Sequence, residues 1–300
     1  MMPGTLVVIC GPTAIGKTEL SIQLAKELGT EIISADSRQF YREMNIGTAK
    51  PSPAQLSAVK HHLIGHLSIR DTYNVSMFEQ DALYILKEIF RTKSHAILCG
   101  GSGLYIDALC RGIDDLPDAD TEIRKKLQDQ LDNEGIESLQ KELQILDPEH
   151  YAEVDRNNPK RLMRAIEVCR IAGKKYSDLR KSQPKSREFN IIKIGLNTDR
   201  EKLFDRINRR TERMIEKGLL KEVMGLRPYK NENALNTVGY KEIFNYLDGS
   251  TELAHAIEKI KTNTRRYAKR QLTWFKKDPS IQWFEPGQFC TILQFIYKKS

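Results

Sequence analysis

The sequence lacks the long apolar run of a membrane-spanning helix. Such a helix needs about 20 predominantly apolar residues, and no stretch of the 300 residues approaches that length. The N-terminus also lacks the basic start, longer apolar run and small-residue cleavage site of a signal peptide, because it passes directly into a strand and a turn. We therefore expect a cytoplasmic protein that makes no contact with a membrane.

Paired cysteines and a complete set of metal ligands are also absent. The five cysteines stand far apart and none belongs to a C-x-x-C pair, so we predict no disulfide and no metal site at them. His62 and His66 have the i, i+4 spacing of zinc ligands, but no further ligand cluster accompanies them or the neighbouring His61. We interpret these three histidines as structural.

Short apolar segments alternate with helical patterns in the first third of the chain. Runs typical of buried strands occur at 5–10, 31–33 and 95–99. Helical patterns lie between them, one extending to Leu28 and one from 74 to 90. Because continuously apolar strands alternate with helices, the sequence predicts an α/β fold with a parallel sheet flanked by helices.

The strand signal disappears in the middle of the chain. Helical patterns dominate there, at 123–131, 136–146 and 158–172. Strand and helix patterns resume later, at 189–196, 200–226, 251–276 and 281–284. The sequence therefore predicts a core formed by residues 1–117 and 186–300, interrupted by a mainly helical insertion subdomain at 118–185.

Residues 11–18, GPTAIGKT, match the phosphate-binding motif G-x-x-x-x-G-K-[ST] in full. The motif follows a buried strand and opens a helix, where backbone N–H groups can bind phosphate oxygens. We expect Lys17 to pair with the terminal phosphate and the Thr18 hydroxyl to help hold Mg²⁺. The motif makes the predicted sheet P-loop NTPase-like. The expected phosphate-binding residues are Gly11, Pro12, Thr13, Ala14, Ile15, Gly16, Lys17 and Thr18.

A P-loop usually binds ATP or GTP, but here the Walker-B acid is missing. The strand at 95–99 ends in a glycine-rich turn, GGSGLY, that offers N–H groups and the Ser102 hydroxyl instead of a carboxylate. The available acid is Asp36, at the end of the 31–33 strand, and in a doubly wound sheet that end faces the ligand crevice. We predict that Asp36 is a catalytic base; the alternative is that it caps a turn.

The charge distribution favours a polyanionic partner. The formal net charge is +8, and residues 262–277 carry six Lys and Arg with no acid, with Tyr267, Trp274 and Phe275 interleaved. This pattern is typical of a nucleic-acid surface, but a solvated helix face with core aromatics would also produce it.

Eight segments, in order across most of the chain, resemble the tRNA dimethylallyltransferase family. They are the P-loop, DSRQFYREMNIGTAKPS (36–52), HHLIGH (61–66), GGSGLY (100–105), NPKRLMRAIEV (158–168), GLLKEV (218–223), VGYKE (238–242) and RRYAKRQLTWFK (265–276). The resemblance implies that the P-loop binds dimethylallyl diphosphate in place of a nucleoside triphosphate. It further implies transfer of the five-carbon group to N6 of the adenosine 3′ of the anticodon, with release of diphosphate, which explains the missing Walker-B acid.

The resemblance also implies roles for individual residues. Lys17, the loop N–H groups and Mg²⁺ would stabilise the leaving diphosphate, and Asp36 would accept the N6 proton. Ser102 stands where the family has an assisting threonine, and Ile15 replaces the small serine common in the loop. Because the acceptor base must leave the anticodon loop, we expect base flipping, with Gln39 contacting the adenine edge. The expected tRNA-binding residues are Asp36, Ser37, Arg38, Gln39, Ser102, Arg124, Lys160, Arg161, Leu162, Met163, Arg164, Arg265 and Arg270.

The chain ends at Ser300 without the Cys/His cluster of eukaryotic relatives, so the resemblance favours a bacterial-type, cytoplasmic enzyme, which we expect to be a monomer. Three alternatives stay open. A small-molecule kinase would use the same P-loop and an Asp base. An isopentenyltransferase acting on free AMP, ADP or ATP would need the basic C-terminal block less. A nucleotide-gated RNA-binding protein would perform no chemistry.

Overall fold

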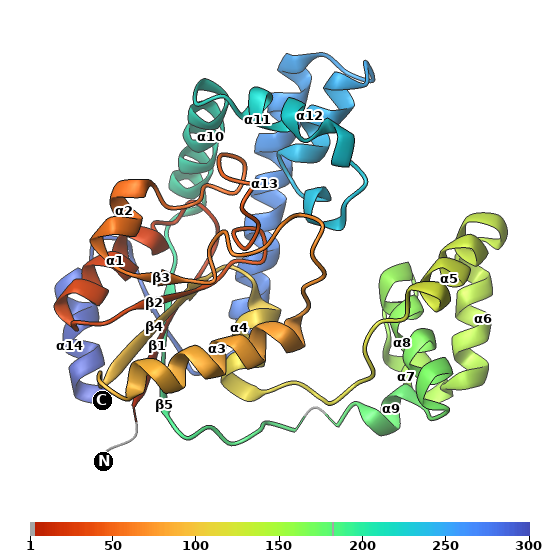
Figure 1. The fold of residues 1–300 in the computed structure, drawn as a ribbon, viewed down its shortest axis with the longest axis horizontal. Coiled ribbons are helices and arrows are strands. Elements are labelled where there is room, and N and C mark those ends of the chain that lie inside the picture. Colours follow the sequence, from red (N-terminus) through yellow and green to blue (C-terminus); the bar gives the residue numbers. More distant parts are fainter. Residues whose placement is uncertain (1–3, 182) are drawn as a thin grey trace. The chain divides into compact units, whose positions relative to one another are not determined.

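A computed structural model describes residues 4–181 and 183–300. Its centre is a six-stranded sheet in the order β3-β2-β4-β1-β5-β6, and every neighbouring pair is parallel (Figure 1). The strands are β1 (Thr5–Cys10), β2 (Ile32–Ala35), β3 (His61–His62), β4 (His95–Gly100), β5 (Asn190–Leu196) and β6 (Ile281–Phe284). The predicted parallel α/β sheet is confirmed. The two-residue edge strand β3 was not predicted, because a segment so short shows no periodicity.

The described residues divide into two compact units. Arg111–Ser186 forms one unit, and the segments before and after it form the other. The sequence had placed the insertion at 118–185. The helices of the larger unit are α1 (Lys17–Glu27), α2 (Pro53–Ala58), α3 (Val75–Phe90), α4 (Gly103–Arg111), α10 (Arg200–Glu216), α11 (Leu219–Gly225), α12 (Tyr240–Leu247), α13 (Leu253–Phe275) and α14 (Phe289–Lys299), with short 3₁₀ turns at Arg227–Tyr229 and Asn233–Leu235.

Both faces of the sheet are buried, and alternate residues of β1 belong to different cores. Leu6 and Val8 pack with residues of α3 and α4, whereas Val7 and Ile9 pack with residues of α1, α10 and α14. This follows from the two-residue period of a strand. Helices therefore cover both faces. Because β1, β2 and β4 are parallel, their carboxyl ends lie at one common edge, where a ligand can bind.

A third core lies beyond this edge of the sheet. It joins α11, α12 and part of α13 to the segment that follows β2, through Tyr41, Met44 and the fully buried Tyr240. The single helix predicted at 200–226 is wrong in one respect, because it is divided at Gly218. Gly218 has φ 94°, a left-handed conformation that ends α10 and lets α11 turn away.

The second unit is helical, as expected for the insertion. It consists of α5 (Thr121–Glu134), α6 (Ile136–Leu146), α7 (Pro148–Glu153), α8 (Pro159–Ala172) and α9 (Tyr176–Leu179). Its core is formed mainly by leucines of α5, α6 and α8. Among the described residues of the whole chain, no helix combines the length and apolar character required to span a bilayer.

Candidate active site

The P-loop connects β1 to α1, and its residues 13–18 line a cavity at the N-terminus of α1. Gly16 has φ 107° and precedes the first helical residue, Lys17, so a residue with a side chain would be strained there. The Lys17 ammonium donates to the carbonyls of Gly11 (3.0 Å) and Pro12 (2.8 Å). Burial lowers the pKa of Lys17 from its usual value. The loop thus combines the backbone N–H groups of a helix N-terminus with a cation, the groups that bind phosphate.

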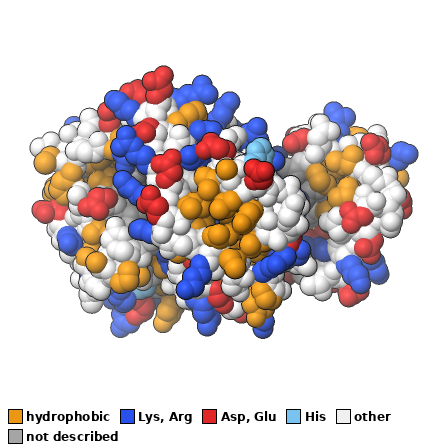
Figure 2. All heavy atoms as spheres, turned by 90° about the horizontal axis from the view of Figure 1, so that it is seen from above, with side chains coloured by type: hydrophobic (Ala, Val, Ile, Leu, Met, Phe, Trp, Pro, Cys, Tyr) orange, Lys and Arg blue, Asp and Glu red, His pale blue; other side chains and the backbone are white. Residues whose placement is uncertain are grey.

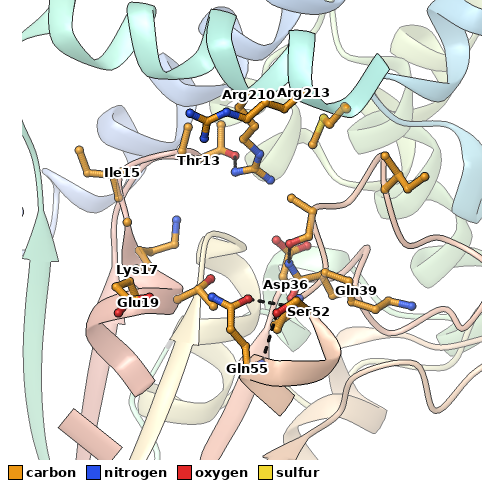
Figure 3. A pocket seen from close by; sticks show the side chains of 18 of the residues that line it. Thr13, Ile15, Lys17, Glu19, Asp36, Gln39, Ser52, Gln55, Arg210 and Arg213 are labelled. Atoms are coloured by element: carbon orange, nitrogen blue, oxygen red, sulfur yellow. Dashed lines mark hydrogen bonds between the residues drawn. The ribbon is translucent and has the colours of Figure 1, made fainter. Parts of the chain in front are cut away.

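Arginines of α10 face the P-loop from the other side of the cavity. Arg206 donates to the Ala14 carbonyl at 2.9 Å, and Arg210 donates to the Thr13 hydroxyl at 3.1 Å. Figure 3 shows Arg210 and Arg213 on the helix above the cavity, with Lys17 and Asp36 below it. Sequence reasoning missed these arginines. Their i, i+4, i+7 spacing on one face of α10 was the available signal.

Two cavities meet at Asp36. The larger, of about 1010 Å³, is lined by residues 13–18 of the P-loop, the α10 arginines and an apolar group formed by Ile46, Ala49, Pro51, Pro53, Leu56 and Met214. The smaller, of about 480 Å³, is lined by Ser37, Arg38 and Arg270 among others. The residues that line both are Thr13, Asp36, Arg210, Met214 and Tyr267. Asp36 therefore lies on the wall of both cavities.

Asp36 lies at the carboxyl end of β2, as predicted, and is half-buried. Its Oδ1 accepts the N–H of Arg38 at 3.0 Å, so Asp36 performs the turn-capping role that was the alternative to a catalytic base. Ser102 lies next to this turn: its Oγ accepts the Ser37 N–H at 3.1 Å and donates to Ser37 Oγ at 3.3 Å. The turns after β2 and β4 are thus joined through two serines, which holds the backbone next to Asp36.

Gln271 of α13 joins the P-loop to the second glycine-rich turn. Its buried side chain accepts the Thr13 N–H at 2.8 Å and donates to the Gly101 carbonyl at 2.9 Å. A β-carbon on Gly101 would lie 2.2 Å from the Gln271 amide nitrogen, so a side chain there would displace the Gln271 amide. The basic helix α13 therefore contributes directly to the site through Gln271, a residue that the sequence did not single out.

Besides Asp36, Ser37 and Ser102, three further predicted tRNA-binding residues of the larger unit make intramolecular hydrogen bonds. Arg38 donates to the carbonyls of residues 233 and 234, and the Gln39 amide donates to those of residues 48 and 49. Arg265 donates to Asn208 of α10 at 3.0 Å. Arg270, by contrast, lines the smaller cavity, where its guanidinium carbon lies 5.8 Å from the Tyr267 ring centroid.

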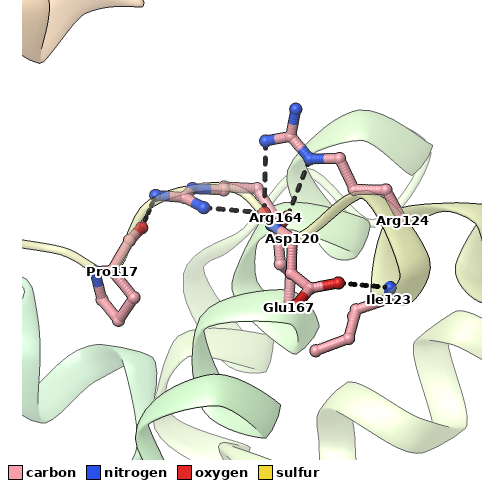
Figure 4. A network of polar contacts seen from close by, with 6 residues as sticks. All are labelled: Pro117, Asp120, Ile123, Arg124, Arg164 and Glu167. Carbon is pink, nitrogen blue, oxygen red and sulfur yellow. Dashed lines mark hydrogen bonds and ion pairs between the residues drawn. The ribbon is translucent and has the colours of Figure 1, made fainter.

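In the second unit, Arg124 and Arg164 share one carboxylate (Figure 4). The fully buried Glu167 accepts Arg124 Nε at 2.8 Å and Arg164 NH1 at 2.7 Å. Arg164 also donates to the Pro117 carbonyl at 2.7 Å. Both arginine side chains nevertheless remain partly exposed, 51% and 32%. Glu167 therefore fixes the position of both guanidinium groups.

The other predicted contacts of this unit differ in exposure. Lys160 and Arg161 are exposed at the start of α8. Met163 is half-buried and packs against the leucine-rich core of the unit. Leu162 has no exposed surface and lies within that core, because it follows the apolar stripe of α8. The structure thus places the Leu162 side chain away from the surface on which an RNA contact was expected.

The three histidines have structural partners. His62 Nε2 lies 2.6 Å from a Glu31 oxygen, His61 Nδ1 lies 2.8 Å from the Val59 carbonyl, and the His66 ring packs edge-on against Phe40. Within 4–181 and 183–300, no group of three or more His, Cys, Asp or Glu side chains is arranged to hold a metal ion.

Comparison with known proteins agrees with this geometry. Residues 39–278 match the family model described as IPP transferase. The chain belongs to the IPP transferase family. It is 51% identical over 292 residues to a tRNA dimethylallyltransferase of Bacteroides thetaiotaomicron, covering 97% of this chain and 95% of the relative. It is 54% identical over 284 residues to one of Christiangramia forsetii, covering 95% and 94%.

Solved structures show the same fold for this IPP transferase. The crystal structure of the full-length tRNA isopentenylpyrophosphate transferase from Bacillus halodurans matches with a TM-score of 0.73 and 37% identity, over 98% of this chain and 96% of that one. A eukaryotic dimethylallyltransferase acting on tRNA matches with a TM-score of 0.80 and 26% identity, over 99% and 80%. The P-loop NTPase-like fold predicted from the sequence is confirmed.

Proposed function

We propose that this IPP transferase moves the dimethylallyl group of dimethylallyl diphosphate to N6 of the adenosine 3′ of the anticodon in tRNA. The observation that carries this proposal is that Asp36 lies where two cavities meet, one ending at a P-loop and one lined by Arg38 and Arg270. A donor and an acceptor can then approach the same carboxylate from separate openings. The names of the similar proteins support the choice of donor and acceptor.

The larger cavity suits an allylic diphosphate. The P-loop N–H groups, Lys17 and Arg210 provide positive charge at one end, and the wall that includes Ile46 and Met214 provides hydrocarbon contacts. When the C1–O bond breaks, its electron pair passes to the diphosphate. These donors stabilise that charge because they are already oriented before the reaction.

Mg²⁺ fits the residues present. Magnesium commonly keeps several waters and binds through substrate phosphates with only one or two protein ligands, so it does not require a cluster of acids. Thr18, which follows Lys17 and lines the larger cavity, would supply its hydroxyl as the protein ligand. When bound, the ion would neutralise diphosphate charge.

Asp36 would act on the acceptor. As the bond from C1 to N6 forms, N6 must lose a proton, and the free Oδ2 side of the Asp36 carboxylate can accept it. Oδ1 is engaged by the Arg38 N–H, which holds the carboxylate in one orientation. Ser102 and Ser37 fix the turn on which Asp36 lies.

The smaller cavity would receive the flipped adenine. Tyr267 and Arg270 offer an aromatic ring and a cation there, the two groups that commonly contact an unstacked base and its phosphate. Figure 2 shows many Lys and Arg side chains on one face of the molecule, with Asp and Glu scattered among them.

Since one chain forms both cavities, we propose that the protein acts as a monomer, in the cytoplasm where tRNA is modified.

The direct test is an incorporation assay. The full chain is incubated with labelled dimethylallyl diphosphate, Mg²⁺ and either tRNA or free AMP, ADP and ATP. We expect label in tRNA at the adenosine 3′ of the anticodon. Label only in free nucleotides, or in neither, would contradict the proposal, and ATP turnover without RNA would favour a small-molecule kinase.

A separate prediction concerns the α8 arginines. Arg161→Ala should weaken tRNA binding and reduce the slope of log K against log salt by about 0.7 to 1, because one phosphate contact is lost. The thermal stability of this variant should not change, since Arg161 is exposed.

Arg164→Ala should weaken tRNA binding in the same way, and it should also lower the free energy of unfolding by about 2 kcal/mol, because the buried Glu167 loses one of its two cations. Binding titrations at several salt concentrations and thermal unfolding measure both effects; identical behaviour of the two variants would contradict this distinction.

A further inference from the structure

The carboxylate of Glu222 collects four neutral donors from two other segments. Its Oε2 accepts the N–H groups of Asn45 (3.0 Å) and Ile46 (2.8 Å). Its Oε1 accepts the N–H of Gly47 (3.0 Å) and the hydroxyl of Tyr240 (2.6 Å). An ionised carboxylate only accepts hydrogen bonds. Each oxygen of Glu222 accepts from two donors, so all four contacts are hydrogen bonds of the correct polarity.

The segment held by Glu222, residues 45–49, separates the two cavities. Ile46 and Ala49 line the larger cavity, whereas Gly47 and Thr48 line the smaller one. Tyr240 packs directly against this segment, since a β-carbon on Gly47 would lie 2.5 Å from its ring. The position of the segment therefore determines the width of both cavities at this point.

Ile46 and Ala49 face the hydrocarbon part of the larger cavity, together with proline, leucine and methionine side chains. The P-loop, at the phosphate end of the same cavity, is fixed separately by Gln271 and by Arg206 of α10. The distance between the 45–49 segment and the P-loop, which are held by different residues, sets the length of cavity available to the allylic chain. Among the contacts of the segment, the carboxylate of Glu222 is the one that holds three consecutive backbone N–H groups.

We propose that Glu222 is a positioning residue that selects the length of the prenyl donor. By holding the backbone of residues 45–47, it sets the position of the apolar wall that Ile46 and Ala49 present to the allylic chain, and so biases transfer toward the five-carbon donor. This inference rests on the proposed function, because it assumes that the larger cavity binds an allylic diphosphate.

Glu222→Gln tests the role without changing the size of the side chain. If the NH₂ group replaces Oε2, it faces the N–H groups of Asn45 and Ile46, and both hydrogen bonds are lost. If it replaces Oε1, it faces the Gly47 N–H, which loses its acceptor, while the Tyr240 hydroxyl can turn to accept from the NH₂ group. At least one hydrogen bond to the segment is therefore lost in either orientation. We expect the KM for dimethylallyl diphosphate to rise about tenfold while kcat changes by less than about threefold. We also expect the preference for dimethylallyl over the ten-carbon geranyl diphosphate to fall about tenfold.

Glu258→Gln is the control variant, and Ile46→Ala is a second test variant. Glu258 forms an exposed ion pair with Lys261 and its substitution changes the net charge equally, so the donor preference should stay at the wild-type value. Ile46→Ala enlarges the cavity directly and should increase the use of geranyl diphosphate even if Glu222→Gln does not fold.

The measurements are steady-state kinetics with both donors and tRNA, and thermal unfolding of each variant. An unchanged donor preference in a folded Glu222→Gln variant, or in Ile46→Ala, overturns the inference. A wild-type chain that transfers no dimethylallyl group to tRNA overturns the proposed function and this inference together. Wild-type transfer to tRNA with unchanged selectivity in the variants overturns the inference alone.

Discussion

Asp36→Ala should abolish prenyl transfer while the protein still binds tRNA. A positioned general base contributes about 10²- to 10⁴-fold to a rate, so we expect kcat to fall by at least about 10²-fold. The predicted tRNA-binding residues are many, whereas the Asp36 side chain is a single half-buried carboxylate, so its loss should leave most of the expected tRNA contacts in place. Single-turnover transfer of label to tRNA and a separate binding titration would measure the two effects.

Asp36→Asn distinguishes the base from the turn cap. Asparagine keeps an oxygen that can accept the Arg38 N–H, so the turn should be retained, but it cannot take a proton from N6. We expect Asn to lose transfer nearly as completely as Ala, with a melting temperature close to that of the wild type. Asp248→Asn, at an exposed carboxylate paired with Arg227, serves as the matched control. Near-normal turnover in Asp36→Asn would remove Asp36 from the role of base.

The sequence predicted the parts of this site that depend on local pattern. The P-loop is contiguous, and its place between a buried strand and a helix follows from apolar runs and glycines that any window of the sequence shows. Asp36 was predicted from the end of a strand in the same way. These predictions succeed because parallel strands bring their carboxyl ends to one edge.

Residues that act from distant segments were not predicted. Arg210 meets Thr13 across 197 positions and Gln271 meets it across 258, and no local pattern contains such pairs. Glu222 was quoted within a family segment but given no role, because its partners are backbone N–H groups that have no signature in a sequence. Leu162 was predicted to contact tRNA together with the basic residues on either side of it, but helical geometry directs its side chain into the core while Arg161 is exposed.

Lys17→Ala should reduce kcat/KM for dimethylallyl diphosphate by about 10²- to 10³-fold, the usual cost of removing one oriented donor to a developing negative charge. In the structure the ammonium is already held toward the loop by the carbonyls of Gly11 and Pro12, so little reorganisation precedes its contact with phosphate. Steady-state kinetics with the donor varied at saturating tRNA would measure the loss.

The distribution of this loss separates Lys17 from the cations that would bind RNA. Because Lys17 lines the larger cavity only, the KM for tRNA should stay within about threefold of the wild-type value. Lys26→Ala, at the exposed end of the same helix, provides a control with the same change of charge. If Lys17→Ala instead raised the KM for tRNA and left donor kinetics intact, the larger cavity could not be the diphosphate site. The roles assigned to the two cavities would then have to be exchanged, although Asp36 would still lie between them.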